Sequence, residues 1–175
     1  MISRRLGLIL LLPLVAACRG DGTGPETGNG SFSASWVGAD TGKLTARPRA
    51  VFCSDGNHLE LFAVQGDAGV GLAVFPPQEL IAGTYDAFDP WEDTVRRPGV
   101  SGAARWFNDK DIPSYQSDWG SLELTKKGPA LAGSFAMHMR KVSGETDTIM
   151  ITGSFSGIIP VPCAADSVPR PGPTK

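Results

Sequence analysis

Residues that could bind a metal ion are few in this chain. The sequence contains two histidines, His58 and His138, and the second lies between Met137 and Met139. Thioether and imidazole groups are ligands that copper accepts. However, side chains alternate between the two faces of a strand, so both methionines would lie on one face and His138 on the other. His58 and Glu60 share a strand face, but no third ligand accompanies them. We therefore expect no metal site and no cofactor.

Four carboxylates, Asp86, Asp89, Glu92 and Asp93, lie close together in a predicted loop. Carboxylate oxygens can bind Ca²⁺, but the EF-hand spacing is absent and two arginines follow at 96–97. The sequence has no G-x-S-x-G motif, and two histidines are few for a Ser-His-Asp arrangement. A pair of glycosidase-like carboxylates stays open, because its spacing is set in space rather than in the sequence. We expect a solvated charged loop and no enzyme.

Aromatic residues are concentrated between residues 85 and 119, which hold 7 of the 14 in the chain. Indole and phenol rings stack on sugars and on apolar molecules. If the protein has a ligand-binding face, we expect it in this region. The candidate residues are Tyr85, Trp91, Trp106, Tyr115 and Trp119. The alternative is that these rings cover one end of the core beneath long loops.

The first 17 residues have the three parts of a secretory signal peptide. Arg4 and Arg5 form the positive part, residues 6–15 are mostly apolar, and two alanines precede the cleavage point. The apolar run is about a dozen residues long, whereas a helix that crosses a membrane core needs about 20. We therefore expect residues 1–17 to be a signal helix that is removed from the mature chain.

The cleavage point, Val15-Ala16-Ala17-Cys18, resembles the lipobox of bacterial lipoprotein precursors. The resemblance covers residues 1–18 and implies that Cys18 becomes the mature N-terminus and carries acyl chains. One chain anchors a protein only marginally, whereas two or more anchor it stably. Arg19 stands where an Asp would resemble an inner-membrane retention signal, which favours the outer membrane of the bacterial cell envelope. The alternative is a soluble secreted protein.

The other two cysteines, Cys53 and Cys163, form an even pair in an oxidising compartment. We expect a disulfide between them. A reactive or metal-binding thiol is the rival interpretation, but the sequence has no C-x-x-C motif and no histidine at ligand spacing from either cysteine.

Composition favours a turn-rich single domain. The chain has 175 residues, of which 22 are glycine and 14 proline, and a formal net charge of −2 that becomes −4 once Arg4 and Arg5 are removed. This much glycine and proline is typical of short strands joined by tight turns. No basic run is present, so we expect no nucleic-acid partner.

The pattern along the chain divides it into a tether, a body and a tail. Residues 18–30 are polar and Gly-rich, which predicts a lipidated N-terminus followed by a flexible tether. Period-two alternation begins at residue 31 and predicts a β domain over 31–163, including a hairpin over 58–75. Pro48 suggests an edge strand or a bulge. Residues 164–175 are Pro-rich and predict a disordered tail.

The body contains eight or nine predicted short strands and no convincing helix. We expect an all-β fold, a single antiparallel β-barrel or β-sandwich in meander order. The body also resembles a group of uncharacterised β-sheet lipoproteins at Gly83-Thr84-Tyr85, at 120–124 and at Gly133-Ser134-Phe135. That resemblance implies no particular activity.

The sequence as a whole predicts a membrane-anchored envelope lipoprotein. Its β domain would be non-catalytic and would bind a small ligand or an envelope protein through the 85–119 region. A structural or assembly subunit of the envelope is the alternative, and a hydrolase of envelope polymers is less favoured.

Overall fold

The computed structural model describes residues 29–91, 94–107, 112–144 and 146–163. The predicted signal peptide, the lipidation site Cys18, nearly all of the tether and the Pro-rich tail lie outside these residues. All regular elements of the described residues are strands, so the predicted all-β class is confirmed.

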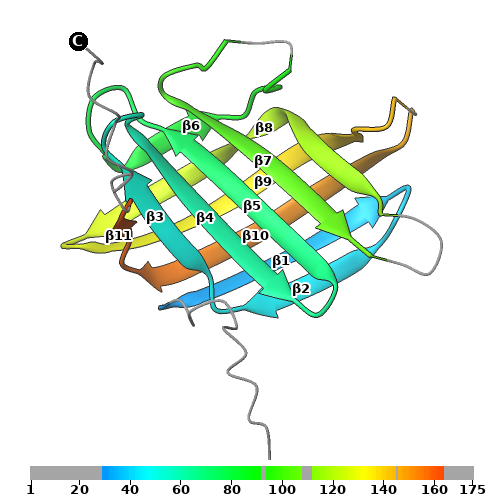
Figure 1. The fold of residues 1–175 in the computed structure, drawn as a ribbon, viewed down its shortest axis with the longest axis horizontal. Coiled ribbons are helices and arrows are strands. Elements are labelled where there is room, and N and C mark those ends of the chain that lie inside the picture. Colours follow the sequence, from blue (N-terminus) through cyan, green and yellow to red (C-terminus); the bar gives the residue numbers. More distant parts are fainter. Residues whose placement is uncertain (1–28, 92–93, 108–111, 145, 164–175) are drawn as a thin grey trace, which may run out of the picture.

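Eleven strands form a single sheet. They are β1 (Ser31–Gly38), β2 (Gly42–Ala46), β3 (Arg49–Cys53), β4 (His58–Gln65), β5 (Ala68–Phe75), β6 (Gly83–Asp86), β7 (Gly99–Trp106), β8 (Ser114–Lys127), β9 (Ala130–Lys141), β10 (Thr148–Ile158) and β11 (Val161–Pro162). The order across the sheet is β11-β3-β4-β5-β7-β8-β9-β10-β1-β2, with β6 paired to β8 (Figure 1). The pairs are antiparallel except β11 with β3. The predicted 58–75 hairpin is confirmed as β4 and β5.

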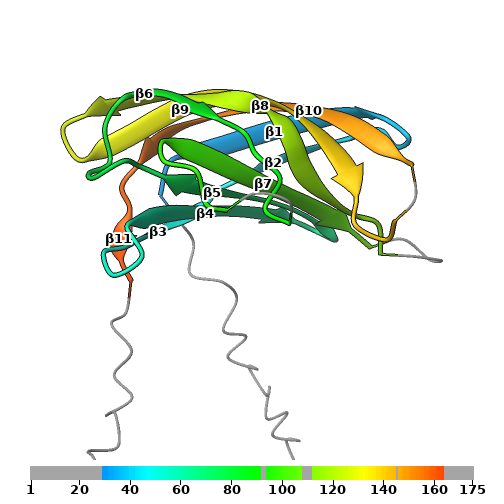
Figure 2. The same cartoon turned by 90° about the horizontal axis from the view of Figure 1, so that it is seen from above.

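The sheet curls into two layers that face each other. Strands β1, β8, β9 and β10 form one layer, and β3, β4, β5 and β7 form the other (Figure 2). Alternate residues of each strand point between the layers and build one apolar core. Phe32 of β1 packs on Phe135 of β9, with ring centroids 5.7 Å apart. Trp36 stacks on Trp106 at 4.9 Å and thereby joins the two layers.

We expected a β-barrel or a β-sandwich, and a closed barrel is not formed, because the sheet remains open between β2 and β4. The chain bends at Arg47 and Pro48, so that β2 pairs with β1 at one edge and β3 pairs with β4 near the other. Where β2 passes β4, a side chain replaces the backbone ladder: the Thr45 N–H donates to Gln65 Oε1 at 2.9 Å. Proline has no N–H to donate at the bend. The result is a curled open sheet, a half-barrel.

The predicted count of eight or nine strands is also wrong. The segment 44–53 is divided at Pro48 into β2 and β3, so Pro48 lies between two strands rather than within an edge strand or at a bulge. Strand β8 runs from Ser114 to Lys127 and continues through a bulge between Ser117 and Trp119. The two-residue strand β11 is too short to produce an alternation pattern.

Candidate functional site

Three of the five aromatic residues proposed for a ligand face lie in the core. Tyr85, Trp106 and Tyr115 are buried. Trp106 stacks on Tyr115 with centroids 5.2 Å apart, and its Nε1–H donates to Asp40 Oδ2 at 2.7 Å. The Tyr85 hydroxyl donates to the carbonyl of Ile81 at 2.8 Å. Burial raises the pKa of Tyr85 above its usual value of 10.0, against the smaller lowering effect of that hydrogen bond.

The other two aromatics, Trp91 and Trp119, are exposed at 77% and 55%. The bulge in β8 turns Trp119 onto the outer face, where its ring stacks on His138 of β9 at 5.1 Å. Nδ1 of His138 lies 3.2 Å from Oδ2 of Asp118. On this face the Trp119 ring therefore contacts His138, and His138 in turn contacts Asp118. Trp91 lies elsewhere, in the loop that precedes β7.

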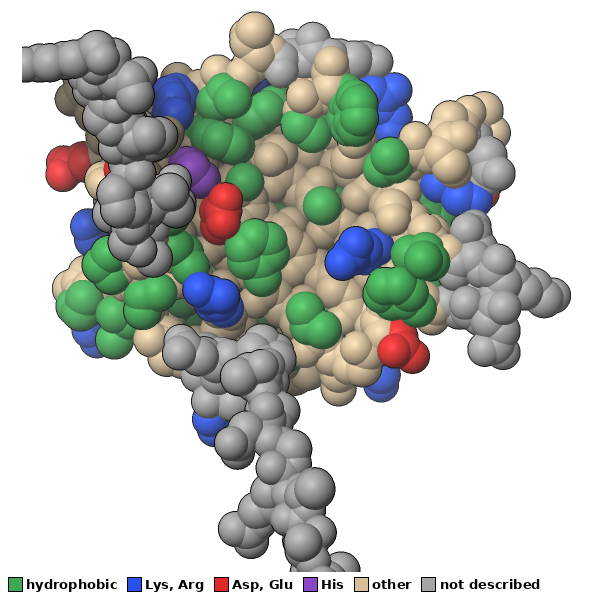
Figure 3. Space-filling model, viewed as in Figure 1, with side chains coloured by type: hydrophobic (Ala, Val, Ile, Leu, Met, Phe, Trp, Pro, Cys, Tyr) green, Lys and Arg blue, Asp and Glu red, His purple; other side chains and the backbone are tan. Residues whose placement is uncertain are grey.

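Trp91 lines a groove of about 580 Å³ on the outer face of β4, β5 and β7. The groove floor consists of small residues of β5 and β7, among them Gly69, Gly71, Ala73, Ser101 and Ala103. In Figure 3, backbone and small side chains occupy much of the middle of this face, with hydrophobic side chains around them.

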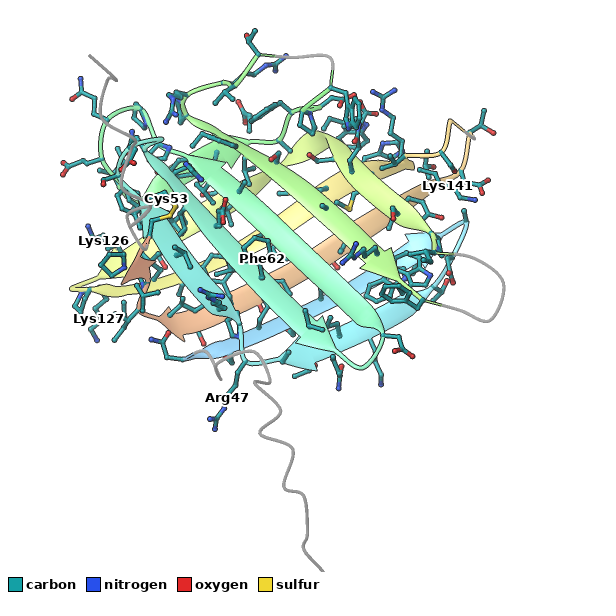
Figure 4. The ribbon with its side chains drawn as sticks, viewed as in Figure 1. Arg47, Cys53, Phe62, Lys126, Lys127 and Lys141 are labelled. Atoms are coloured by element: carbon teal, nitrogen blue, oxygen red, sulfur yellow. A yellow bond between two sulfur atoms is a disulfide. The ribbon has the colours of Figure 1, made fainter. Side chains whose placement is uncertain are left out.

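Phe62 forms the opposite wall of the groove and is 47% exposed. It pairs with Gly71 across the β4–β5 ladder, and a Cβ at Gly71 would come within 3.2 Å of the Phe62 ring. The ring therefore lies against the glycine. Figure 4 places Phe62 in the middle of the β3–β4–β5 face. Val64, two residues further along β4, extends the same wall and is exposed.

A buried carboxylate holds the loop that carries Trp91. Asp89 Oδ1 accepts the backbone N–H of Trp91 at 2.8 Å and Nε2 of Gln116 at 2.9 Å. Its Oδ2 forms an ion pair with the guanidinium of Arg140 on β9. Asp89 is 3% exposed, so this pairing compensates much of the cost of removing its charge from water. The loop is thereby fixed to β8 and β9.

Polar groups at the margins of the groove are sparse and of both signs. Glu60 lies on the Phe62 side, where its Oε1 is 3.2 Å from Nε2 of His58. Arg105 lies on the β7 side, with its guanidinium 5.7 Å from the ring centroid of Phe107. The backbone of β5 pairs with β4 and β7, and that of β7 pairs with β5 and, over Ala103–Arg105, with β8.

The described residues contain no group of three or more His, Cys, Asp or Glu side chains placed to hold a metal. Strand geometry separates Met137 and Met139, which are buried, from His138 on the outer face. Of the four clustered carboxylates, Glu92 and Asp93 lie outside the described residues. The prediction that these carboxylates lie in a solvated loop is wrong for Asp89, which is buried and forms an ion pair with Arg140.

The predicted disulfide between Cys53 and Cys163 is confirmed, with Cα atoms 4.7 Å apart. It links the end of β3 to the residue after β11. The N–H of Cys163 also donates to the carbonyl of Phe52 at 2.8 Å.

Phe62 and Val64 were absent from the sequence-based candidates. A signal was present, because both residues occupy positions of β4 that alternate with the buried Leu61 and Ala63. Apolar side chains on the outward face of a half-buried strand indicate a contact surface.

No protein-family model, curated protein or solved structure matches the chain. Among the described residues, no helix is long and apolar enough to cross a membrane.

Proposed function

We propose that the chain is a lipid-anchored protein of the bacterial cell envelope whose non-catalytic β domain binds a ligand or partner through the groove. The single observation that carries the binding role is the exposed apolar wall of Trp91 and Phe62 on either side of a floor of small residues. The anchor is supported by the sequence that ends at Cys18, and the outer membrane is favoured by Arg19.

The groove fits a flat apolar or aromatic group. Apart from Gly71, against which the Phe62 ring lies, the small residues leave the floor free of large side chains that would hold such a group away from the sheet. The rings of Trp91 and Phe62 offer apolar area at its sides, and Arg105 offers a positive charge at one margin. Aromatic contacts of this kind stabilise a complex mainly by removing apolar area from water.

The groove is tested with anilinonaphthalene sulfonate, an aromatic anion, as the probe. The protein used is the mature chain with Cys18→Ser. Trp91→Ala and Phe62→Ala should each lower the affinity about tenfold, because each removes roughly 60 Å² of apolar contact at about 25 cal/mol per Å².

Trp119→Ala is the matched control, because it removes an exposed indole that does not line the groove. It should leave the affinity within about twofold. Equal losses in Trp91→Ala and Trp119→Ala, or no loss in Trp91→Ala, would count against the groove as the binding site.

The anchor is tested by intact mass of the membrane fraction, measured with and without reductant. We expect a chain that starts at Cys18 and carries acyl chains, and a gain of two hydrogen atoms on reduction of the Cys53–Cys163 disulfide. An unmodified chain in the soluble fraction would overturn the anchor and leave a secreted protein.

A further inference from the structure

One end of the β domain combines exposed apolar residues with lysines. We call it the basic–apolar end and define it as Ile81, Lys126, Lys127, Ile159 and Val161, all of which are exposed. Lys126 and Lys127 project from the end of the molecule that also holds Cys53 (Figure 4). In Figure 3, hydrophobic side chains gather at the same end with basic side chains at their margin.

Three segments that are distant in the sequence meet at this end. Lys126 and Lys127 end β8 at its turn into β9, and Nζ of Lys126 donates to the carbonyl of Leu80 at 3.3 Å. Ile159 and Pro160 connect β10 to β11, and Val161 begins β11. The segments surround a hollow of about 560 Å³ whose lining includes Phe52, Leu80, Leu131 and Pro160. The charged residues in that lining are Lys126 and Glu79, and Lys127 follows Lys126 outside the lining, so the two lysines exceed this one carboxylate by one charge.

The chain from the anchor enters the β domain at this same end. The side chain of Asn29 forms two hydrogen bonds with the backbone of Ile159: its Nδ2 donates to the carbonyl at 3.0 Å, and its Oδ1 accepts the N–H at 2.8 Å. Asn29 is eleven residues after Cys18. Because a residue extends the chain by at most about 3.6 Å, Asn29 lies within about 40 Å of Cys18.

We propose that the basic–apolar end is a docking surface for an anionic phospholipid membrane. The inference rests on the proposed lipid anchor, which would bring this end of the domain to the membrane first. Each lysine near an anionic lipid surface strengthens binding about fivefold. Ile159 and Val161 would enter the interface beside the head groups. The anchor raises the effective concentration of the membrane, so a weak contact is sufficient to orient the domain.

The proposal is tested with the mature chain carrying Cys18→Ser, so that binding does not depend on the lipid. Vesicles of phosphatidylcholine, with or without phosphatidylglycerol, are sedimented with the protein. We expect binding that requires phosphatidylglycerol and weakens as salt is added. Lys126→Gln with Lys127→Gln should lower the affinity about 30-fold. Ile159→Ser with Val161→Ser should lower it about tenfold.

Lys43→Gln is the matched control, because Lys43 is exposed on β2 outside the basic–apolar end. It should change the affinity less than about twofold. An unchanged midpoint of urea unfolding shows that each variant is folded. No binding to vesicles with phosphatidylglycerol, equal binding to neutral vesicles, or an equal loss in Lys43→Gln would overturn the proposal. Failure of the anchor itself is detected separately, by the intact mass.

Discussion

Asp89 is the buried carboxylate that joins the groove wall to the sheet. We expect Asp89→Ala to lower the free energy of unfolding by about 2–3 kcal/mol, measured by urea unfolding. A broken buried ion pair typically costs about 3–5 kcal/mol. The expected cost is smaller here, because Arg140 is 37% exposed and water can solvate part of the charge left behind. The Trp91 N–H and the amide of Gln116 would also lose their acceptor.

Asp118→Ala provides the comparison at the residue scale. Asp118 lies on the outer face beside His138 and is about one-third exposed, so its loss should cost about 0.5 kcal/mol or less. A loss in Asp89→Ala no greater than in Asp118→Ala would show that the Asp89 pairing does not stabilise the loop.

The sequence predicted the direction of some side chains but not of others. Alternation along one strand was enough to separate Met137 and Met139 from His138. It did not identify which aromatics are exposed. Trp119 faces outward because a bulge shifts the alternation of β8, and Trp91 lies in a loop whose Asp89 pairs with Arg140, a residue far along the chain.

At the scale of elements, the disulfide holds the shortest strand of the sheet. Strand β11 has two residues and, within the described part of the chain, pairs with β3 alone. Cys53 and Cys163 are separated by 110 residues. We expect Cys53→Ser with Cys163→Ser to lower the free energy of unfolding by about 4–5 kcal/mol, the value that the chain-entropy model gives for a loop of this length. Urea unfolding measures the change.

Reduction of the unaltered protein supplies the matched measurement. It should produce a similar loss, because it opens the same covalent loop. An unfolding midpoint that is unchanged in both the double variant and the reduced protein would contradict the prediction.

The elements were predicted best where a strand lies between tight turns. The β4–β5 hairpin follows from alternation on both sides of Gly66, whose φ of +55° suits a turn. The two halves of the segment around Pro48 lie at opposite edges of the sheet, and the sequence alone could not assign them there. That division depends on which neighbour each half meets, β1 or β4.

For the whole molecule, a shared core predicts a single unfolding transition. Both layers contribute to one cluster of buried residues, and the stack of Trp36 on Trp106 crosses between them. We expect circular dichroism and tryptophan fluorescence to report the same urea midpoint. Two separated midpoints would show that the layers unfold independently.

Local pattern and covalent chemistry were sufficient for the all-β class, for most strand positions and for the pairing of Cys53 with Cys163. These properties depend on the alternation of neighbouring residues or on the number of available cysteines. Only the tertiary structure decided that the sheet stays open between β2 and β4, that Phe62 and Trp91 line one groove with a floor of small residues, and that Lys126 and Pro160 line one hollow. Each of these depends on contacts between residues distant in the sequence, which arise from the curvature of the whole sheet rather than from any single strand.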